Sequence, residues 1–306
     1  MSAKVIVVGS FNADLVTYLP RLPEPGETLS GHRFLTFAGG KGSNQAVAAA
    51  RLGAEVTFIG RVGRDIFAEM AFQLWQAEGI RTEYVTQDDA TSTGVAAILV
   101  EDSGQNVIAV TLGANLAMST ADIDRAESVI AQADVLLTQL EVDPATAAHA
   151  LRVAHRHNVT TILNPAPAAL LPADVTALAD YLTPNESELL IMSGQPDAEL
   201  AAAALLQDER QTLVVTLGHE GVRWQTHAAN GRSPAFAVQA IDTVGAGDAF
   251  NAGLAVALAE GKPREAALHF ANATAAISVT RQGASASMPT RSEVDAFLVQ
   301  NEGWTP

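Results

Sequence analysis

The seven-residue run Asp-Thr-Val-Gly-Ala-Gly-Asp, which ends at Asp248, places small residues and a carboxylate at the start of a helix predicted over residues 247–259. The backbone N–H groups of Gly245, Ala246 and Gly247 can face one point without obstruction by side chains, and such a helix start attracts an anion. A carboxylate beside that anion repels it, so Asp248 is better suited to take a proton from a hydroxyl that attacks a phosphorus. A lone Gly-Asp pair would indicate only an acidic helix start, but the whole run favours the site.

A second loop of small residues, Gly-Gly-Lys-Gly-Ser-Asn at positions 39–44, also enters a predicted helix. It is not the phosphate loop of nucleotide-binding proteins, because that pattern needs a glycine where Leu35 stands and a serine or threonine where Gly42 stands. The loop instead indicates a close approach of the backbone to a polar ligand, with Lys41 and Asn44 as hydrogen-bond donors. A tight turn with an incidental lysine is the alternative.

Asn12 and Asp14 follow the first predicted strand and lie two positions apart, so they point the same way on an extended segment. The dinucleotide-binding pattern is excluded here, since the glycines and the helix that it requires are missing. An amide and a carboxylate side by side suit the vicinal hydroxyls of a sugar. A simple Asn-x-Asp turn is the equally open alternative.

Two further segments place polar groups at predicted helix and strand ends. Asn185 and Glu188 lie three positions apart at a helix start, where their oxygens could hold Mg²⁺ directly or through water. A helix cap at Asn185 is the favoured alternative. The segment Thr-Leu-Gly-His-Glu-Gly, from Thr216 to Gly221, ends an apolar strand, which is where open α/β sheets bind ligands, although taken by itself the segment favours a simple tight turn.

The elements that must position these motifs alternate along the chain. Strands are predicted at residues 5–8, 55–59, 135–140, 159–163 and 212–216, and helices at residues 43–52, 66–78, 119–131, 144–157, 186–192, 247–259 and 264–278, with a last amphipathic helix around Val294, Phe297 and Leu298. Ser119 and Asp122 form a capping box at the start of the helix over 119–131. Such alternation predicts an α/β fold in which helices wrap a mostly parallel central sheet.

Two stretches interrupt this alternation, and neither contains a helical pattern. Residues 12–37 have turns rich in proline and glycine, and residues 94–112 have the pattern of a hairpin with its turn at 102–104. We expect both to leave the main layer and to pair as a small separate sheet, which would act as a lid over the strand ends. The expected organisation is one domain, residues 1–306, with this lid inserted in it.

Composition excludes several classes of function. The chain has 306 residues, a formal net charge of −16 and no cysteine, so thiolate catalysis, disulfides and zinc-thiolate sites are ruled out. The negative charge disfavours binding to nucleic acid or to an anionic membrane surface. No apolar stretch approaches the roughly 18 residues that span a bilayer, and no secretory signal is visible, so a cytoplasmic protein is expected.

In this order along the chain, the motifs resemble those of the ribokinase-like (PfkB) family of carbohydrate kinases. The matching segments are Asn12 with Asp14, and residues 25–28, 39–44, 164–167, 184–188, 216–218 and 242–248. The family has a three-layer α/β sandwich with a β-sheet lid, and the lids of such kinases pair into a homodimer. The resemblance therefore implies a phosphotransferase that acts on an alcohol group of a small sugar and uses ATP.

The resemblance also implies roles for single residues. Asp248 matches the general base, and the amides of Gly245, Ala246 and Gly247 match the anion hole. The matching sugar-binding residues are Asn12, Asp14, Gly40, Lys41, Asn44, Glu141 and Asp248. The matching nucleotide-binding residues are Asn185, Thr216, Gly218, Gly221, Gly247 and Asn272, the last of which borders the adenine.

Two cations are implied by the same resemblance. Asn185 and Glu188 match a magnesium motif. An activating monovalent cation, K⁺, has the matching ligands Asp242, Val244, Ser278, Arg281, Gly283 and Ser287.

The preferred reaction is phosphorylation of D-ribose at O5 to D-ribose 5-phosphate. The alternatives 2-deoxyribose, fructose and adenosine would share the catalytic run, and Phe11, Thr111 and Leu112 are expected to border whichever sugar is bound. A non-catalytic sugar sensor is a different class of function. It is disfavoured because the glycines of the anion hole and Asp248 are all present.

Overall fold

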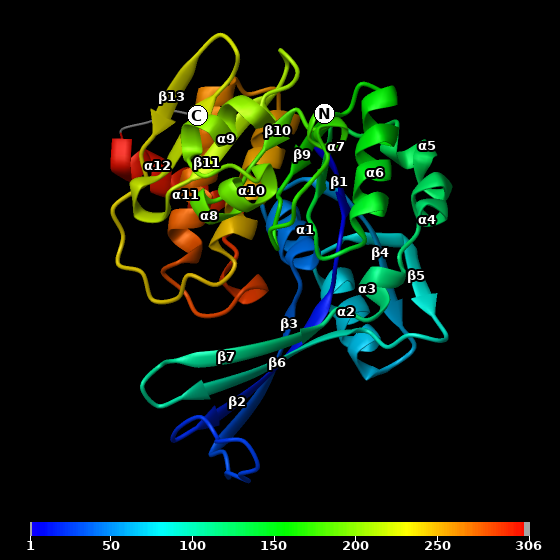
Figure 1. Cartoon of the computed structure of the whole chain (residues 1–306), viewed down its shortest axis with the longest axis vertical. Coiled ribbons are helices and arrows are strands. Elements are labelled where there is room, and N and C mark those ends of the chain that lie inside the picture. The colour runs from blue at the N-terminus through cyan, green and yellow to red at the C-terminus, as the bar shows by residue number, and fades with distance from the viewer. Residues whose placement is uncertain (1, 303–306) are drawn as a thin grey trace.

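The computed structural model describes residues 2–302, while Met1 and residues 303–306 of the expected domain lie outside the described residues. Its framework is a nine-stranded central sheet (Figure 1). In spatial order the strands are β13 (Asn230–Ser233), β12 (Val222–Gln225), β11 (Thr212–Thr216), β10 (Tyr181–Leu182), β9 (Thr160–Leu163), β8 (Val135–Thr138), β1 (Lys4–Val8), β4 (Glu55–Gly63) and β5 (Arg81–Asp88). All neighbours from β5 to β11 pair in parallel, and only the pairs β11–β12 and β12–β13 are antiparallel, so the predicted α/β fold is confirmed.

Two hydrophobic cores lie on opposite faces of this sheet. In β1, Val5 and Val7 point into one core, while Ile6 and Val8 point into the other, as the period of two in a strand requires. The first core packs against α1 (Lys41–Arg51), α2 (Ile66–Ala77), α10 (Ala246–Ala259), α11 (Arg264–Ser278) and α12 (Arg291–Glu302). The second packs against α4 (Thr120–Arg125), α5 (Glu127–Ile130), α6 (Pro144–Arg156), α8 (Glu186–Ser193) and α9 (Ala198–Leu205).

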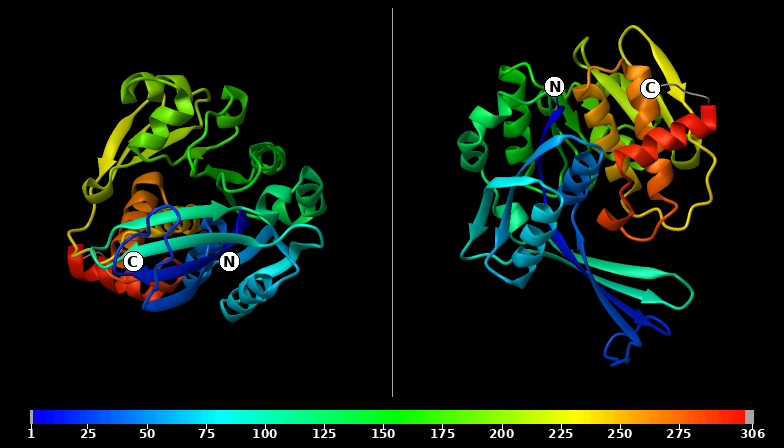
Figure 2. Two further views of the ribbon diagram at one scale, coloured as in Figure 1. Left: turned by 60° about the horizontal axis from the view of Figure 1, so that its bottom comes forward. Right: turned by 180° about the vertical axis from the view of Figure 1, so that it is seen from behind.

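A second sheet of four strands projects away from this body (Figures 1 and 2). Its order is β3 (Arg33–Gly39), β2 (Asn12–Leu19), β6 (Gly94–Glu101) and β7 (Asn106–Thr111), and only the central pair β2–β6 is parallel. The strands come from the two stretches in which the sequence has no helical pattern. The chain leaves the main body directly after β1 and again after β5, so the second sheet begins at the carboxyl edge of the central one.

Some boundaries differ from the sequence expectations. The capping box of Ser119 and Asp122 is confirmed, but the helix predicted over 119–131 breaks at Ala126, whose N–H donates to the carbonyl of Ile123 in a tight turn. Strands β5, β10, β12 and β13, the short helices α3 (Ala114–Ala117) and α7 (Ala173–Thr176), and helix α9 were not predicted. Among the described residues, no helix has the length and apolarity that crossing a membrane requires.

Candidate active site

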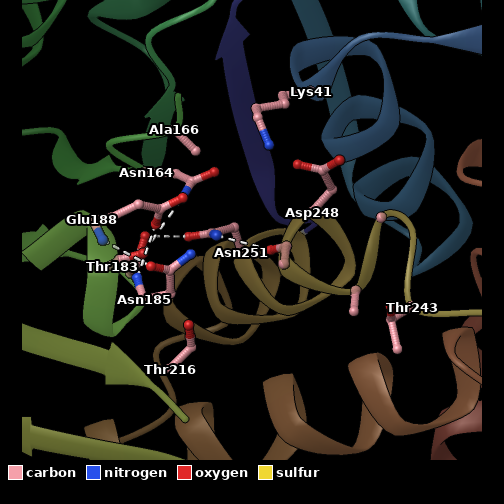
Figure 3. Close-up of a pocket in the computed structure, with 13 residues that line it drawn as sticks. Lys41, Asn164, Ala166, Thr183, Asn185, Glu188, Thr216, Thr243, Asp248 and Asn251 are labelled. Carbon is pink, nitrogen blue, oxygen red and sulfur yellow. Dashed lines mark hydrogen bonds between the residues drawn. The ribbon is translucent and has the colours of Figure 1, made fainter. Parts of the chain in front are cut away.

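A cleft of about 220 Å³ opens at the carboxyl edge of the central sheet (Figure 3). Loops after β9, β10 and β11 form one wall, and the starts of α1 and α10 form the other. It is lined by Lys41, Asn164, Ala166, Thr183, Asn185, Glu188, Thr216, Thr243, Gly245, Ala246, Gly247, Asp248 and Asn251. The carboxyl ends of parallel strands and the amino ends of two helices therefore meet where an open α/β sheet binds ligands.

The start of α10 has the geometry of an anion site. Gly245 is the residue before the helix and has a φ of 77°, a left-handed conformation that an L side chain rarely adopts. The N–H of Ala246 already donates to the carbonyl of Thr243 at 3.2 Å, so Gly245 and Gly247 are the better donors to a bound anion. One turn further along α10, the side chain of Asn251 donates to the carbonyl of Gly247 at 2.8 Å and holds the first turn in place.

Asp248 is 5% exposed and lies beside Lys41 on the same wall of the cleft (Figure 3). Burial raises the pKa of the Asp248 carboxyl to about 6, against the opposing effects of the Lys41 cation and of hydrogen bonds from Asn44 and Gln45. Those bonds run from Asn44 Nδ2 to Oδ2 at 3.0 Å and from Gln45 Nε2 to Oδ1 at 3.1 Å. A carboxylate with this pKa is ionised at neutral pH and is a stronger base than an exposed aspartate, as a proton acceptor should be.

The predicted sugar-binding residues gather where β2 leaves the body, beside the start of α1. Glu141 accepts hydrogen bonds from the Lys41 N–H at 2.9 Å, from Asn12 Nδ2 at 3.4 Å and from the Ser10 hydroxyl. Burial, and secondly the charge of Glu141, raise the pKa of Asp14 to about 7. Gly40 has a φ of 86° and turns the chain into α1 beside Asn12.

Lys41 connects this cluster to the cleft. Burial lowers the pKa of its ammonium group, but Asp248, Glu141 and Glu188 outweigh that effect and the net shift is upward. The lysine therefore stays charged between three carboxylates. A cation fixed at this point attracts negative phosphate oxygens. It lies beside the start of α10, where those oxygens are expected to bind.

Asn185 and Glu188 form the helix cap that was the favoured alternative in their sequence. Asn185 Oδ1 accepts from the Glu188 N–H and from the Ser187 hydroxyl, while Glu188 Oε2 accepts from the Asn185 N–H, with each bond at 2.8 Å. The cap uses the amide oxygen of Asn185 fully and leaves the carboxylate of Glu188 on the cleft wall. This donor set fits Mg²⁺ held through water at Glu188 better than direct ligation by Asn185.

The predicted nucleotide-binding residues lie along the neighbouring edge. The Thr216 N–H donates to the carbonyl of Pro184 at 2.9 Å, which joins the end of β11 to the Asn185 cap. Gly221 and Asn272 both contact Ser233: a Cβ on Gly221 would lie 2.3 Å from its carbonyl oxygen, and Asn272 Nδ2 donates to that oxygen at 3.0 Å. The amide nitrogen of Asn272 therefore anchors the end of β13. Gly218 begins the exposed turn of η1 (Gly218–Glu220).

The residues expected to hold a monovalent cation come from two loops that Asp242 fastens together. Its two oxygens accept from the N–H groups of Val244 at 3.0 Å and Gly283 at 2.9 Å. The hydroxyls of Ser278 and Ser287 donate to backbone carbonyls at 2.8 Å, so their oxygens keep the capacity to accept. The Arg281 N–H donates to the carbonyl of Ser278 at 3.1 Å, which completes the second loop. Oxygen donors of this kind fit an alkali cation.

Sequence reasoning missed four buried amides at or near the site, of which Asn251 on α10 lines the cleft itself, and placed one aromatic residue wrongly. Gln45 and Gln139 lie behind Asp248, and Asn115 holds Phe11 and Asn12 through the Phe11 N–H at 3.0 Å and Asn12 Oδ1 at 2.9 Å. Phe11 does not border the sugar site with its ring, as was expected, because the ring packs edge-on against Trp75 at 5.6 Å and is 1% exposed. The available signal was a polar residue within an otherwise apolar strand pattern, as at Gln139.

Comparison with known proteins agrees with this geometry. The family model "pfkB family carbohydrate kinase" matches residues 2–291. The chain belongs to the pfkB family of carbohydrate kinases. Such an enzyme is a phosphotransferase with an alcohol as acceptor.

Individual pfkB relatives extend over almost the whole chain. A ribokinase of Haemophilus influenzae is 41% identical and a deoxyribokinase of Salmonella typhi 38% identical, each over 97% of this chain and 99% of its own length. Among solved structures, that of Arabidopsis thaliana ribokinase complexed with ribose and ATP superimposes with a TM-score of 0.88 at 32% identity, covering 97% of this chain and 99% of that one.

Proposed function

We propose that this pfkB kinase transfers the γ-phosphoryl group of ATP to O5 of D-ribose. The observation that carries the proposal is the position of Asp248, a buried carboxylate at an open helix start, beside a lysine and inside a cleft. The names of the relatives support ribose as acceptor, and the Arabidopsis ribokinase that binds ribose and ATP supports the pair of substrates.

The mechanism follows from the groups around the cleft. Asp248 takes the proton of the sugar hydroxyl as its oxygen forms a bond to the γ-phosphorus, and the bond from that phosphorus to the oxygen of ADP breaks. The amides of Gly245 and Gly247 donate to the oxygens of the transferred group, where negative charge is concentrated. Lys41 lies on the same side and balances the charge of Asp248 before the reaction begins.

The cations have supporting roles in this proposal. Glu188 would hold Mg²⁺ through water, and the ion bound there would neutralise phosphate charge. K⁺ at Asp242 and its neighbouring oxygens would add positive charge beside the anion hole. The residues proposed for the Mg²⁺ site are Asn185 and Glu188. Those proposed for the K⁺ site are Asp242, Val244, Ser278, Arg281, Gly283 and Ser287.

The choice of sugar is tested by a parallel kinase assay on D-ribose, 2-deoxyribose, fructose and adenosine. We expect kcat/KM for ribose to exceed that for 2-deoxyribose by about tenfold or more, since a buried polar group that loses its hydroxyl partner discriminates strongly. The Salmonella typhi relative makes 2-deoxyribose the second candidate. No turnover of ribose, with turnover of another acceptor, would reject the proposed substrate.

The four-stranded sheet acts as a lid in this proposal and as the contact between two copies of the chain. Apolar side chains are exposed on its edge strands: Phe34 and Phe37 on β3, and Val107, Ile108 and Val110 on β7. Pairing of two lids would cover them. Sedimentation that shows a dimer, converted to a monomer by Phe34→Glu with Ile108→Glu, is the expected result, whereas a monomeric wild-type chain would contradict it.

The acid limb of activity should follow the titration of Asp248. Because burial raises the pKa of this carboxyl to about 6 and only the ionised form accepts a proton, kcat/KM should fall about tenfold for each pH unit below that value. The measurement is kcat/KM for ribose at saturating ATP between about pH 4.5 and about pH 8.5. A flat profile between pH 5 and 7 would contradict an Asp248 base.

Potassium should accelerate the reaction. We expect several-fold higher kcat in potassium chloride than in tetramethylammonium chloride at equal ionic strength, because only the small cation fits among the oxygens beside Asp242. Asp242→Asn removes the charge but can still accept one hydrogen bond, so it should lose the difference between the two salts. Equal rates for the wild-type enzyme in both salts would remove K⁺ from the proposal.

A further inference from the structure

A chain of buried amides lies directly behind Asp248. Gln45 on α1 and Gln139, the residue after β8, are both 0% exposed. Gln139 Nε2 donates to Gln45 Oε1 at 2.5 Å, and Gln45 Nε2 donates to Asp248 Oδ1 at 3.1 Å and to Asn164 Oδ1 at 3.2 Å. We call Gln139 and Gln45 the amide relay.

The partners of the relay determine which way each amide points. An ionised carboxylate only accepts hydrogen bonds, so the nitrogen of Gln45 must face Asp248. Its two hydrogens then serve Asp248 and Asn164, and its oxygen accepts the hydrogen that Gln139 donates. If the amide of Gln45 turned over, its oxygen would face two other oxygens. Gln139 thus selects the orientation in which Gln45 stabilises the carboxylate.

Within the described residues, this arrangement leaves several buried polar atoms without a hydrogen-bond partner. Asn44 Oδ1, Thr138 Oγ1 and Gln139 Oε1 are buried and, within the part of the chain that the structure describes, lack a hydrogen-bond partner. Each such atom destabilises the folded protein relative to an apolar side chain of similar shape. These three atoms lie on the segments that carry Gln45 and Gln139, next to the amide relay, which indicates a role in the site rather than in the core.

We propose that the amide relay positions Asp248 for proton removal, with Gln45 fixing the carboxylate and Gln139 fixing Gln45. Gln45 and Gln139 act through Asp248 and are positioning residues. The inference rests on the proposed role of Asp248 as general base, and it assigns the second glutamine, which does not touch the carboxylate, a measurable effect on turnover.

Other charged groups near Asp248 also affect the pKa of its carboxyl. Lys41 faces it from α1 and Glu141 from the segment after β8, with opposite effects on its pKa. The charge of Glu141 contributes to the raised pKa of Asp14, and the charge of Glu188 contributes to the raised pKa of Lys41. None of these groups changes in the variants that test the relay. Gln139→Glu adds a carboxyl of its own, whose charge can raise the pKa of Asp248 and move the acid limb, so the relay is tested by the alkaline limb.

The decisive variant is Gln139→Glu, because a glutamate side chain has the shape of glutamine. Its neutral carboxyl can donate a hydrogen bond, whereas its ionised carboxylate can only accept one. While the introduced carboxyl is neutral, its O–H donates to Gln45 Oε1 and the relay keeps its direction. Once it ionises, it can only accept, so Gln45 turns its nitrogen toward it and its oxygen toward Asp248. We expect kcat near the wild-type value at the acid end and a fall of about tenfold or more above roughly pH 7.

Three further variants separate positioning from stability. Gln139→Met fills the space without a hydrogen bond and should lower kcat by less than about tenfold without an alkaline limb. Gln45→Met should lower kcat by roughly tenfold or more, shift its acid limb upward and leave KM for the sugar within a few-fold. Gln211→Glu changes a buried glutamine at the amino end of β11, away from the cleft, and should lower Tm without an alkaline limb.

The outcomes distinguish the relay from the proposed function. A Gln139→Glu profile that parallels wild type, or a fall that coincides with loss of folded protein in Tm measurements at the same pH, overturns the relay. If Asp248→Asn abolishes turnover while Gln139→Glu behaves as wild type, only the relay fails. If Asp248→Asn stays active, the proposed base fails as well.

Discussion

Replacing Asp248 by asparagine is expected to reduce kcat by roughly 10²- to 10⁴-fold while the sugar still binds. Asparagine has the size of aspartate and can accept one of the hydrogen bonds from Asn44 and Gln45, but it cannot take a proton from the attacking hydroxyl. The anion hole, Lys41 and the sugar-binding cluster stay in place. The measurements are kcat in a coupled assay of ADP release and the Kd for ribose by calorimetry.

The same substitution should make the protein more stable at neutral pH. The pKa of Asp248 in the folded chain, about 6, lies above the ordinary aspartate value of 3.8, so the folded state holds the proton more tightly than the unfolded state. Ionisation therefore destabilises the folded state as pH rises from about 4 to about 6, and the penalty is complete above that window. Tm of Asp248→Asn should exceed that of wild type at pH 8 and approach it at about pH 4.

Asp122 offers a matched control with the opposite sign. It is also buried, but hydrogen bonds from Ser119 and Thr86 and the charge of Arg61 outweigh desolvation and lower the pKa of its carboxyl. It therefore stabilises the folded state above its unfolded pKa, and Asp122→Asn should lower Tm at neutral pH without changing kcat. If Asp248→Asn keeps near wild-type kcat, the carboxylate is not the base.

The sequence sufficed for the parts of the fold where local pattern and burial agree. The continuous apolar run of β1 indicates a strand covered on both faces, and the two hydrophobic cores confirm it. The run ending at Asp248 places glycines and an acidic residue in one helical turn, so the expected helix start needed no tertiary information. The pairing of β2 with β6 is different, since only the absence of helical pattern pointed to it.

The remainder depended on contacts between distant segments. Gln139 was counted as part of a strand over 135–140, because the sequence does not show that β8 ends at Thr138 and turns its next side chain toward α1. Phe11 follows the first strand, as a binding residue would. Its ring nevertheless belongs to the core, because it packs against Trp75 from a distant segment of the chain. Strands β12 and β13 are four residues each, too short for their alternation to stand out.

Gly245→Ala is the second substitution with a large expected effect, because the residue determines how α10 begins. Its φ of 77° disfavours any side chain, and a Cβ there would lie 3.2 Å from Ala284 Cα and from Met288 Cε. Relief of this strain and of these close contacts is expected to move the backbone, and with it the amides of Gly245 and Gly247. Since loss of one donor to a developing anion costs about 10²- to 10³-fold, we expect kcat to fall by roughly 10²-fold. The assay is steady-state kinetics with ribose and ATP, together with Tm.

Gly261→Ala distinguishes misplacement of the anion hole from strain alone. Gly261 follows the other end of α10 with a φ of 76°, and among the described residues nothing lies within 4 Å of the Cβ it would gain. The backbone strain is thus the same at both ends of one helix, on the order of 1 kcal/mol, but only one end faces the cleft. If both variants lose a similar amount of Tm but only Gly245→Ala loses kcat, the fall in kcat results from displaced amides of the anion hole. An equal fall in kcat for both variants would attribute it to destabilised α10, and the anion hole would lose its support.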